Sequence, residues 1–104
     1  MYRMTVLHPH PADPAAFRAH YEATHLLLVA KLPGLLSSHH AFDLGGPEET
    51  VPYFCIWEGT FDSRAAMTEA MQSPAGQAVT ADAATLGTGA VVLRYEVMGG
   101  SDAA

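Results

Sequence analysis

Apolar residues in the segment 14–32 recur three or four positions apart, which is the spacing of one face of a helix. Asp13 followed by Pro14 supplies an N-cap carboxylate and a proline at the first helical position, and the pattern ends at Pro33 and Gly34. The segment therefore predicts a helix of about residues 14–32. Its stripe, in which a histidine lies among apolar residues, consists of Phe17, Tyr21, Thr24, His25, Leu28 and Leu32.

Four segments have the length and composition of β-strands. Residues 2–8 (YRMTVLH) are rich in β-forming types and stop at prolines, and residues 35–44 (LLSSHHAFDL) end at the turn-forming run GGPEETVP. Residues 53–61 (YFCIWEGTF) follow at once, and residues 90–98 (AVVLRYEVM) come last. The remaining tail, residues 99–104, is expected to be disordered.

Two further helices are predicted between the third and fourth strands. Asp62 or Ser63 can cap the segment SRAAMTEAMQ, and Ser73 with Pro74 repeats the cap-then-proline signal before PAGQAVTADAATL. The resulting order, β-α-β-β-α-β, is that of a ferredoxin-like sandwich, an α+β fold. We expect it to form one domain over residues 1–98.

The last strand carries apolar residues on both of its sides. One side carries Val91, Leu93, Tyr95 and Val97, and the other carries Val92, Arg94, Glu96 and Met98, so both sides have bulky apolar groups. If the helices all pack on one face of the sheet, the other face should be polar in a monomer. We therefore predict a homodimer in which a second copy covers the open apolar face.

Composition excludes several classes of protein. The chain has 104 residues and a formal net charge of -6 at pH 7, so it lacks the basic patch needed to bind nucleic acid. There is no apolar run of membrane length, and the start MYRMTVLHPHPAD is too short and interrupted for a signal peptide, so we expect no membrane partner and a cytoplasmic location. The single cysteine, Cys55, cannot form an internal disulfide.

The segment FRAHYEATHLLLVAKLPGL, residues 17–35, resembles the signature of EthD-family proteins, which are named after ethyl tert-butyl ether degradation. The segments YRMTVLHPHPADPAAF, WEGTFDS, MQSPAGQAVTAD and VVLRYEVM are also similar to the family pattern, so the resemblance covers residues 2–98. It implies a dimeric α/β barrel, in which two ferredoxin-like protomers pack sheet to sheet and each has a cleft between its sheet and helices. The wider superfamily includes cofactor-independent monooxygenases, haem-degrading enzymes, lactone isomerases and polyketide cyclases.

His25 and Tyr21 are the candidate catalytic residues. A neutral imidazole takes or gives a proton near pH 7, and Tyr21, one turn earlier, lies within reach to orient His25 or to hold a substrate oxygen. The alternative is structural: a core histidine bonded to a backbone carbonyl and a tyrosine that only packs.

Apolar walls for a substrate are expected from Phe17, Leu28 and Trp57, although Trp57 as core or dimer-interface filler is the competing interpretation. Strand alternation sends His39 and His40 to opposite faces, so only one lines the cleft; we favour His40, against both being surface residues.

Two carboxylates, Glu58 and Asp82, match the family pattern. Either could be the partner of a histidine, and Glu58 is also a candidate substrate-binding residue; capping or surface pairing is the alternative.

No metal or cofactor is predicted. The six histidines include His8 and His10 in the run HPHP, but the prolines restrict the backbone, no second ligand pair has matching spacing, and a solvated loop is the expected structure. Nucleotide-binding and CxxC motifs are absent from the sequence, and Cys55 has no evident activating neighbour.

These observations favour a small dimeric enzyme that binds an apolar, oxygen-bearing molecule, with His25 as proton shuttle. The reaction stays open among cofactor-free oxidation, isomerisation and decarboxylation, and the resemblance favours oxidation. One alternative is a non-catalytic carrier or accessory protein for a hydrophobic metabolite in a degradation pathway, which has no turnover to lose in His25→Ala. Another is haem binding, which a Soret band would reveal.

Overall fold

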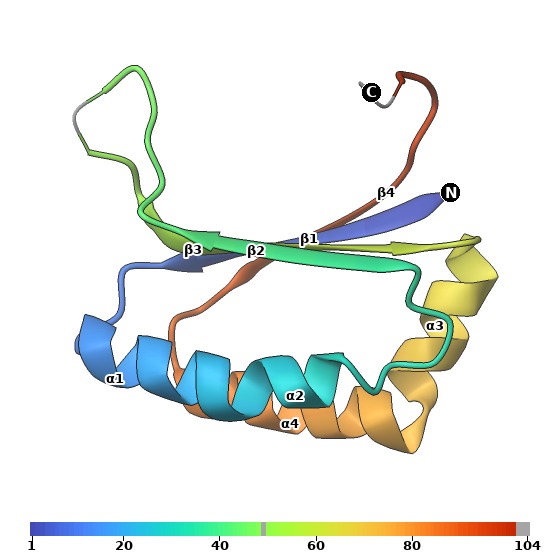
Figure 1. Ribbon diagram of the computed structural model, residues 1–104, viewed down its shortest axis with the longest axis horizontal. Helices are drawn as coiled ribbons and strands as arrows, with labels where there is room; N and C mark the ends of the chain where they lie inside the picture. Colours follow the sequence, from blue (N-terminus) through green and yellow to red (C-terminus); the bar gives the residue numbers. More distant parts are fainter. Residues whose placement is uncertain (49, 102–104) are drawn as a thin grey trace.

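A four-stranded antiparallel sheet with helices on one face makes up the computed structural model, which describes residues 1–48 and 50–101. The strand order is β2-β3-β1-β4, so the two central strands are β1 and β3 (Figure 1). This arrangement confirms the predicted ferredoxin-like α+β fold. The strands are β1 (Tyr2–Pro9), β2 (Ser37–Phe42), β3 (Tyr53–Phe61) and β4 (Val91–Glu96).

The first helical segment is a continuous rod made of three pieces. They are α1 (Pro14–His20), a π-helical turn η1 (Tyr21–His25) and α2 (Leu26–Val29). The predicted cap forms, since the Asp13 carboxylate accepts a hydrogen bond from the Ala16 N–H at 3.1 Å.

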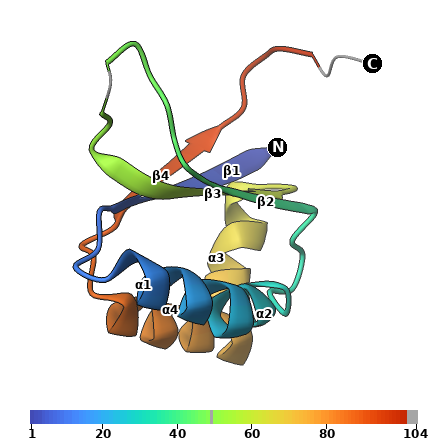
Figure 2. The same ribbon diagram turned by 60° about the vertical axis from the view of Figure 1, so that its left-hand side comes forward.

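Two further helices, α3 (Arg64–Gln72) and α4 (Pro74–Leu86), meet at a sharp corner. Ser63 caps α3, and Ser73 ends α3 and caps α4, with its hydroxyl accepting from the Gly76 N–H at 3.1 Å. Figures 1 and 2 show α4 beside the rod beneath the sheet, with α3 running from the end of β3 down to α4. Both helices therefore follow the capping signals in the sequence.

The π turn changes which residues the rod buries. Four residues advance an α-helix by about 400°, so positions four apart drift by about 40° per step. A turn closed by an i→i+5 hydrogen bond, here from the Leu26 N–H to the Tyr21 carbonyl, holds more residues and offsets that drift. The predicted stripe was therefore partly wrong, because Thr24 is exposed and Leu28 only half-buried. The buried residues of the rod are Phe17, Tyr21, His25 and Val29.

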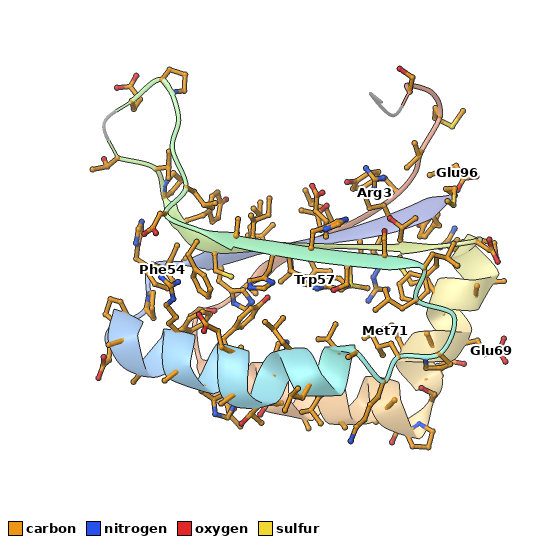
Figure 3. The ribbon with its side chains drawn as sticks, viewed as in Figure 1. Arg3, Phe54, Trp57, Glu69, Met71 and Glu96 are labelled. Atoms are coloured by element: carbon orange, nitrogen blue, oxygen red, sulfur yellow. The ribbon has the colours of Figure 1, made fainter. Side chains whose placement is uncertain are left out.

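Alternate residues of the sheet face the helices. Trp57 of β3 stands opposite Val6 of β1, and Figure 3 shows its side chain between the sheet and the helices. On the same face the register pairs His8 with Cys55, and Met4 with Arg94 of β4. The main core lies here and includes the buried residues Met4, Val29, Leu32, Trp57, Phe61, Met67 and Ala70.

The opposite face of the sheet is open and mixed in character: it is apolar on β4, as predicted, but the other strands carry polar residues there, among them Arg3, Glu58 and His39. On β4, Val91, Leu93 and Tyr95 are 38%, 48% and 37% exposed. The Tyr95 hydroxyl shares a hydrogen bond of 2.9 Å with the Thr5 hydroxyl of β1. Within the described residues, no helix packs on this face (Figure 1).

The ends of the strands differ modestly from the predicted bounds. The second strand is shorter than residues 35–44 because Asp43 adopts a positive φ of 57°, which leaves the extended conformation. The domain bounds and the disorder of residues 99–104 stay predictions, and residues 102–104 lie outside those described. Among the described helices, none is long and apolar enough to cross a membrane.

Candidate active site

A cavity of about 240 Å³ lies between the sheet and the helices. Its walls are mainly apolar, with Trp57 and Met71 among them. The lining residues that are also exposed are Thr80 of α4 and Ala90, Val92 and Arg94 at β4, so the cavity opens between α4 and β4. The polar lining residues are His8, Tyr21, His25, Thr80 and Arg94.

His25 forms a close pair with a carboxylate on α4. Its Nδ1 lies 2.8 Å from Oδ2 of Asp82, and Nε2 of His20 lies 2.8 Å from Oδ1 of the same carboxylate. The side chains of His25 and Asp82 are 8% and 12% exposed, whereas that of His20 is 41% exposed. Asp82 therefore connects a buried histidine on the cavity wall to a solvent-facing one.

The position of the hydrogen on the His25 ring follows from the ionised state of Asp82. Burial raises the pKa of Asp82, but hydrogen bonds from His20 and His25 outweigh burial and hold the pKa below its ordinary value. The ionised carboxylate only accepts hydrogen bonds, so Nδ1 of His25 must carry a hydrogen. In neutral His25 the lone pair is then on Nε2, and this nitrogen can take a proton.

Tyr21 holds the ring of His25 from one side. The two rings stack with centroids 5.3 Å apart, and Phe17 stacks on the other side of Tyr21 at 5.5 Å. Burial raises the pKa of Tyr21 well above its ordinary value, with the adjacent Cys55 thiol adding to the effect. Tyr21 therefore stays neutral and packs His25 in place.

His8 is a site residue that the sequence analysis missed. The expected solvated loop was wrong, because His8 is in β1, 2% exposed, with its ring edge-on to Phe17 and Tyr21. Its Nδ1 lies 2.8 Å from the Thr88 hydroxyl. Burial, with a smaller contribution from the nearby His25, lowers the pKa of His8 to about 4, so His8 is neutral at pH 7. Strand alternation groups His8 with Met4, but it does not say which side of the strand is buried.

Three predicted residues lie on the cavity wall: His25, Tyr21 and Trp57. Trp57 Nε1 donates a hydrogen bond of 2.9 Å to the Ser38 hydroxyl, which fixes the indole. The predicted carboxylate partner is confirmed for Asp82.

The other predicted residues lie elsewhere. His40 is on the helix-facing side of β2, with its ring 6.0 Å from Tyr21, but it does not line the cavity. Phe17 supports Tyr21 in a separate cluster with Cys55, and Leu28 is half-buried away from the cavity. Glu58 was misplaced, since it pairs in register with His39 on the outer face of the sheet.

Two more lining residues, Thr80 and Arg94, were not expected. Alternation groups Arg94 with Val92, but the sequence does not say which side of that strand the helices cover. Within residues 1–48 and 50–101, no group of three or more His, Cys, Asp or Glu side chains is arranged to hold a metal ion. Burial raises the pKa of Cys55 to about 11, although the hydrogen bond with Tyr21 opposes this, so the thiol is not ionised at neutral pH.

Known proteins are similar to this chain in sequence. Residues 9–87 match the model of the EthD domain. The chain is 34% identical over 97 residues to an uncharacterized 11.0 kDa protein from the thcB-thcC intergenic region of Rhodococcus erythropolis, covering 91% of this chain and 92% of that protein.

Solved structures have the same fold as this chain. An ethyl tert-butyl ether degradation (EthD) family protein from Bacillus halodurans superposes with a TM-score of 0.89 at 28% identity, covering 94% of this chain and 99% of the other. A hydroxynitrile lyase from Passiflora edulis shares the fold, with a TM-score of 0.77 at 18% identity over 97% of this chain and 96% of the other. From the match over residues 9–87 and the Rhodococcus relative, this chain belongs to the EthD family.

Proposed function

We propose that the protein binds an apolar, oxygen-bearing small molecule in the cavity and that His25 transfers a proton to or from it. The observation that carries this proposal is the hydrogen bond of 2.8 Å between His25 and Asp82 at the wall of an apolar cavity. A histidine whose tautomer is fixed by a carboxylate is a typical general base.

The proposed first step removes a proton from a carbon next to an activated carbonyl. Nε2 of His25 takes the proton, and the resulting imidazolium is stabilised by the ionised Asp82 on its other nitrogen. The apolar walls exclude water, which strengthens this charge interaction. In the tautomer whose Nδ1 accepts from the Thr88 hydroxyl, neutral His8 donates a hydrogen bond from Nε2 to the carbonyl oxygen, where negative charge develops.

The reaction class that we favour is cofactor-free oxidation by O₂. In this reaction a methylene group next to the carbonyl becomes a second carbonyl, one oxygen atom of O₂ enters the product, and the other leaves as water with the two hydrogens. The resemblance to a superfamily that includes cofactor-independent monooxygenases supports oxidation. Isomerisation begins with the same proton removal and ends with the proton returned to a different carbon.

We also propose a homodimer formed through the open face of the sheet. Burying Val91, Leu93 and Tyr95 against a second copy removes apolar surface from water, which is the main driving force for association. A sheet-to-sheet dimer leaves the mouth of the cavity, on the helix-facing side between α4 and β4, accessible to ligand.

A carrier of a hydrophobic metabolite is the alternative, because an apolar cavity also suits storage or transfer. The two functions predict different effects of His25→Ala, because an enzyme has turnover to lose and a carrier has none. Oxygen consumption and product formation would be measured with apolar cyclic ketones such as anthrone, and ligand binding by fluorescence of Trp57, the single tryptophan.

An enzyme should lose at least about 100-fold in turnover in His25→Ala, which is far more than it loses in ligand affinity. His10→Ala is the matched control, since His10 is exposed and outside the cavity. Binding without turnover in the wild-type protein would instead support the carrier.

A further inference from the structure

Arg94 is the one cationic side chain among the residues that line the cavity. It belongs to β4 and stands opposite Met4 of β1. Val92 is on the same side of β4, and Met4 and Val92 also line the cavity. Arg94 is exposed, which places it at the open end between α4 and β4 rather than in the apolar interior.

The guanidinium of Arg94 has no internal partner within residues 1–48 and 50–101, where it makes no ion pair and no side-chain hydrogen bond. Arg18 pairs with Glu22 at 2.8 Å and Arg3 donates to the Thr60 hydroxyl at 3.3 Å. Among the described residues Arg64 also makes no such contact, but it is exposed on α3 and does not line the cavity. Arg94 is therefore distinguished by its position, as an unpaired cation at the mouth of an apolar cavity in a chain with a net charge of -6.

A ligand that fills the cavity removes water from Arg94, and this desolvation is unfavourable unless the ligand supplies an anionic partner. A guanidinium presents a planar fork of donors that matches the two oxygens of a carboxylate. The volume of about 240 Å³ limits the apolar body of the ligand to a compact ring or branched chain.

We propose that the ligand is a compact apolar carboxylic acid, whose carboxylate pairs with Arg94 at the mouth while its body lies against Trp57 and the reacting end reaches His25. The inference rests on the proposed function of the cavity and adds the class of ligand. Arg94 thereby determines specificity, because a neutral molecule of the same shape supplies no anionic partner and only a weaker hydrogen bond to the guanidinium.

The test uses matched pairs of an acid and its primary amide, from benzoate and benzamide to 4-tert-butylbenzoate and 4-tert-butylbenzamide. Each is titrated into the full-length protein at pH 7 while the fluorescence of Trp57 is followed. Of the two acids, the one that binds more tightly should bind at least about tenfold more tightly than its own amide. This preference should weaken as the salt concentration is raised.

Arg94→Gln should abolish the preference for the acid and leave the affinity for the amide within about threefold. Arg64→Gln is the matched control, since Arg64 is an exposed arginine on α3 outside the cavity, and it should keep the preference.

Equal affinity for acid and amide in the wild-type protein, or an unchanged preference in Arg94→Gln, would overturn the inference and leave the cavity's proposed function standing. If Trp57 responds to neither member of any pair, both the inference and the proposed binding function are overturned.

Discussion

His20 and His25 converge on one carboxylate, with Nε2 of the first and Nδ1 of the second each 2.8 Å from an oxygen of Asp82. In an α-helix, residues five apart diverge by about 140° around the axis, which would send the two imidazoles in different directions. The π turn Tyr21–His25 reduces that divergence. The unusual turn and the two-histidine contact with Asp82 are therefore parts of one arrangement.

Replacing Asp82 by asparagine should reduce turnover by at least about 100-fold. The amide has no charge to stabilise the imidazolium of His25 and no longer fixes its tautomer. Ligand affinity reported by Trp57 should change less than about threefold, because Asp82 does not line the cavity. A variant with unchanged turnover would remove Asp82 from the mechanism.

The contribution of Asp82 to the stability of the fold should decrease at acid pH. Its pKa is lowered on folding, so the stabilisation is present above the unfolded pKa of about 4 and is lost as pH falls through the lower folded pKa. In urea unfolding at pH 7, Asp82→Asn should be less stable than wild type by about 2 kcal/mol. That difference should shrink when the comparison is repeated near pH 3. A constant difference at both pH values would contradict the ionised pair.

His8 should destabilise the fold as pH falls from about 6.5 to about 4. Its pKa is lowered to about 4 on folding, so the unfolded chain binds a proton that the native protein excludes. Wild type should lose about 2–3 kcal/mol over this range relative to His8→Gln, which keeps a hydrogen-bonding group near Thr88 but does not titrate. NMR of the His8 ring checks the cause, and a midpoint near 6.5 would contradict a buried neutral imidazole.

The position of the Trp57 indole depends on Gly59. A Cβ added at Gly59 would overlap with Cη2 of Trp57, so Gly59→Ala must displace the ring. We expect a loss of about 1–3 kcal/mol in stability, a shift in tryptophan emission and weaker ligand binding. Gly45→Ala, where an added Cβ meets nothing within 4 Å, is the control. Unchanged emission in Gly59→Ala would contradict the close contact.

Dimerisation is tested at the open face of the sheet. Wild type should sediment at micromolar concentration as a particle of about twice the chain mass of 11.0 kDa. Leu93→Glu places a charge in the proposed interface and should yield monomers, whereas Thr68→Glu, on the exposed side of α3, should remain dimeric. A monomeric wild-type protein would refute the proposed interface.

The sequence predicts most of the elements because their signals are local. Asp13 and Ser73 are both followed by proline, and each caps a helix as expected. The π turn has no such local signal, so its effect on Thr24 and Leu28 could not be anticipated.

The site was harder to predict because it depends on packing between distant segments. The contact between His25 and Asp82 joins residues 57 positions apart, and it exists because α4 packs beside the rod. Alternation groups Arg94 with Val92 and His8 with Met4, but it does not decide which group the helices cover. The burial of His8 and the position of Glu58 on the outer face follow from that choice.

The central claim, that His25 acts on a ligand held in the cavity, is tested most directly by a crystal structure with a ligand identified through Trp57 fluorescence. We predict density for the ligand within hydrogen-bond distance of Nε2 of His25, with Nδ1 still bonded to Asp82. Ligand density outside the cavity, or Nε2 of His25 bonded to a backbone carbonyl in a cavity closed by side chains, would contradict the claim and make His25 a structural residue.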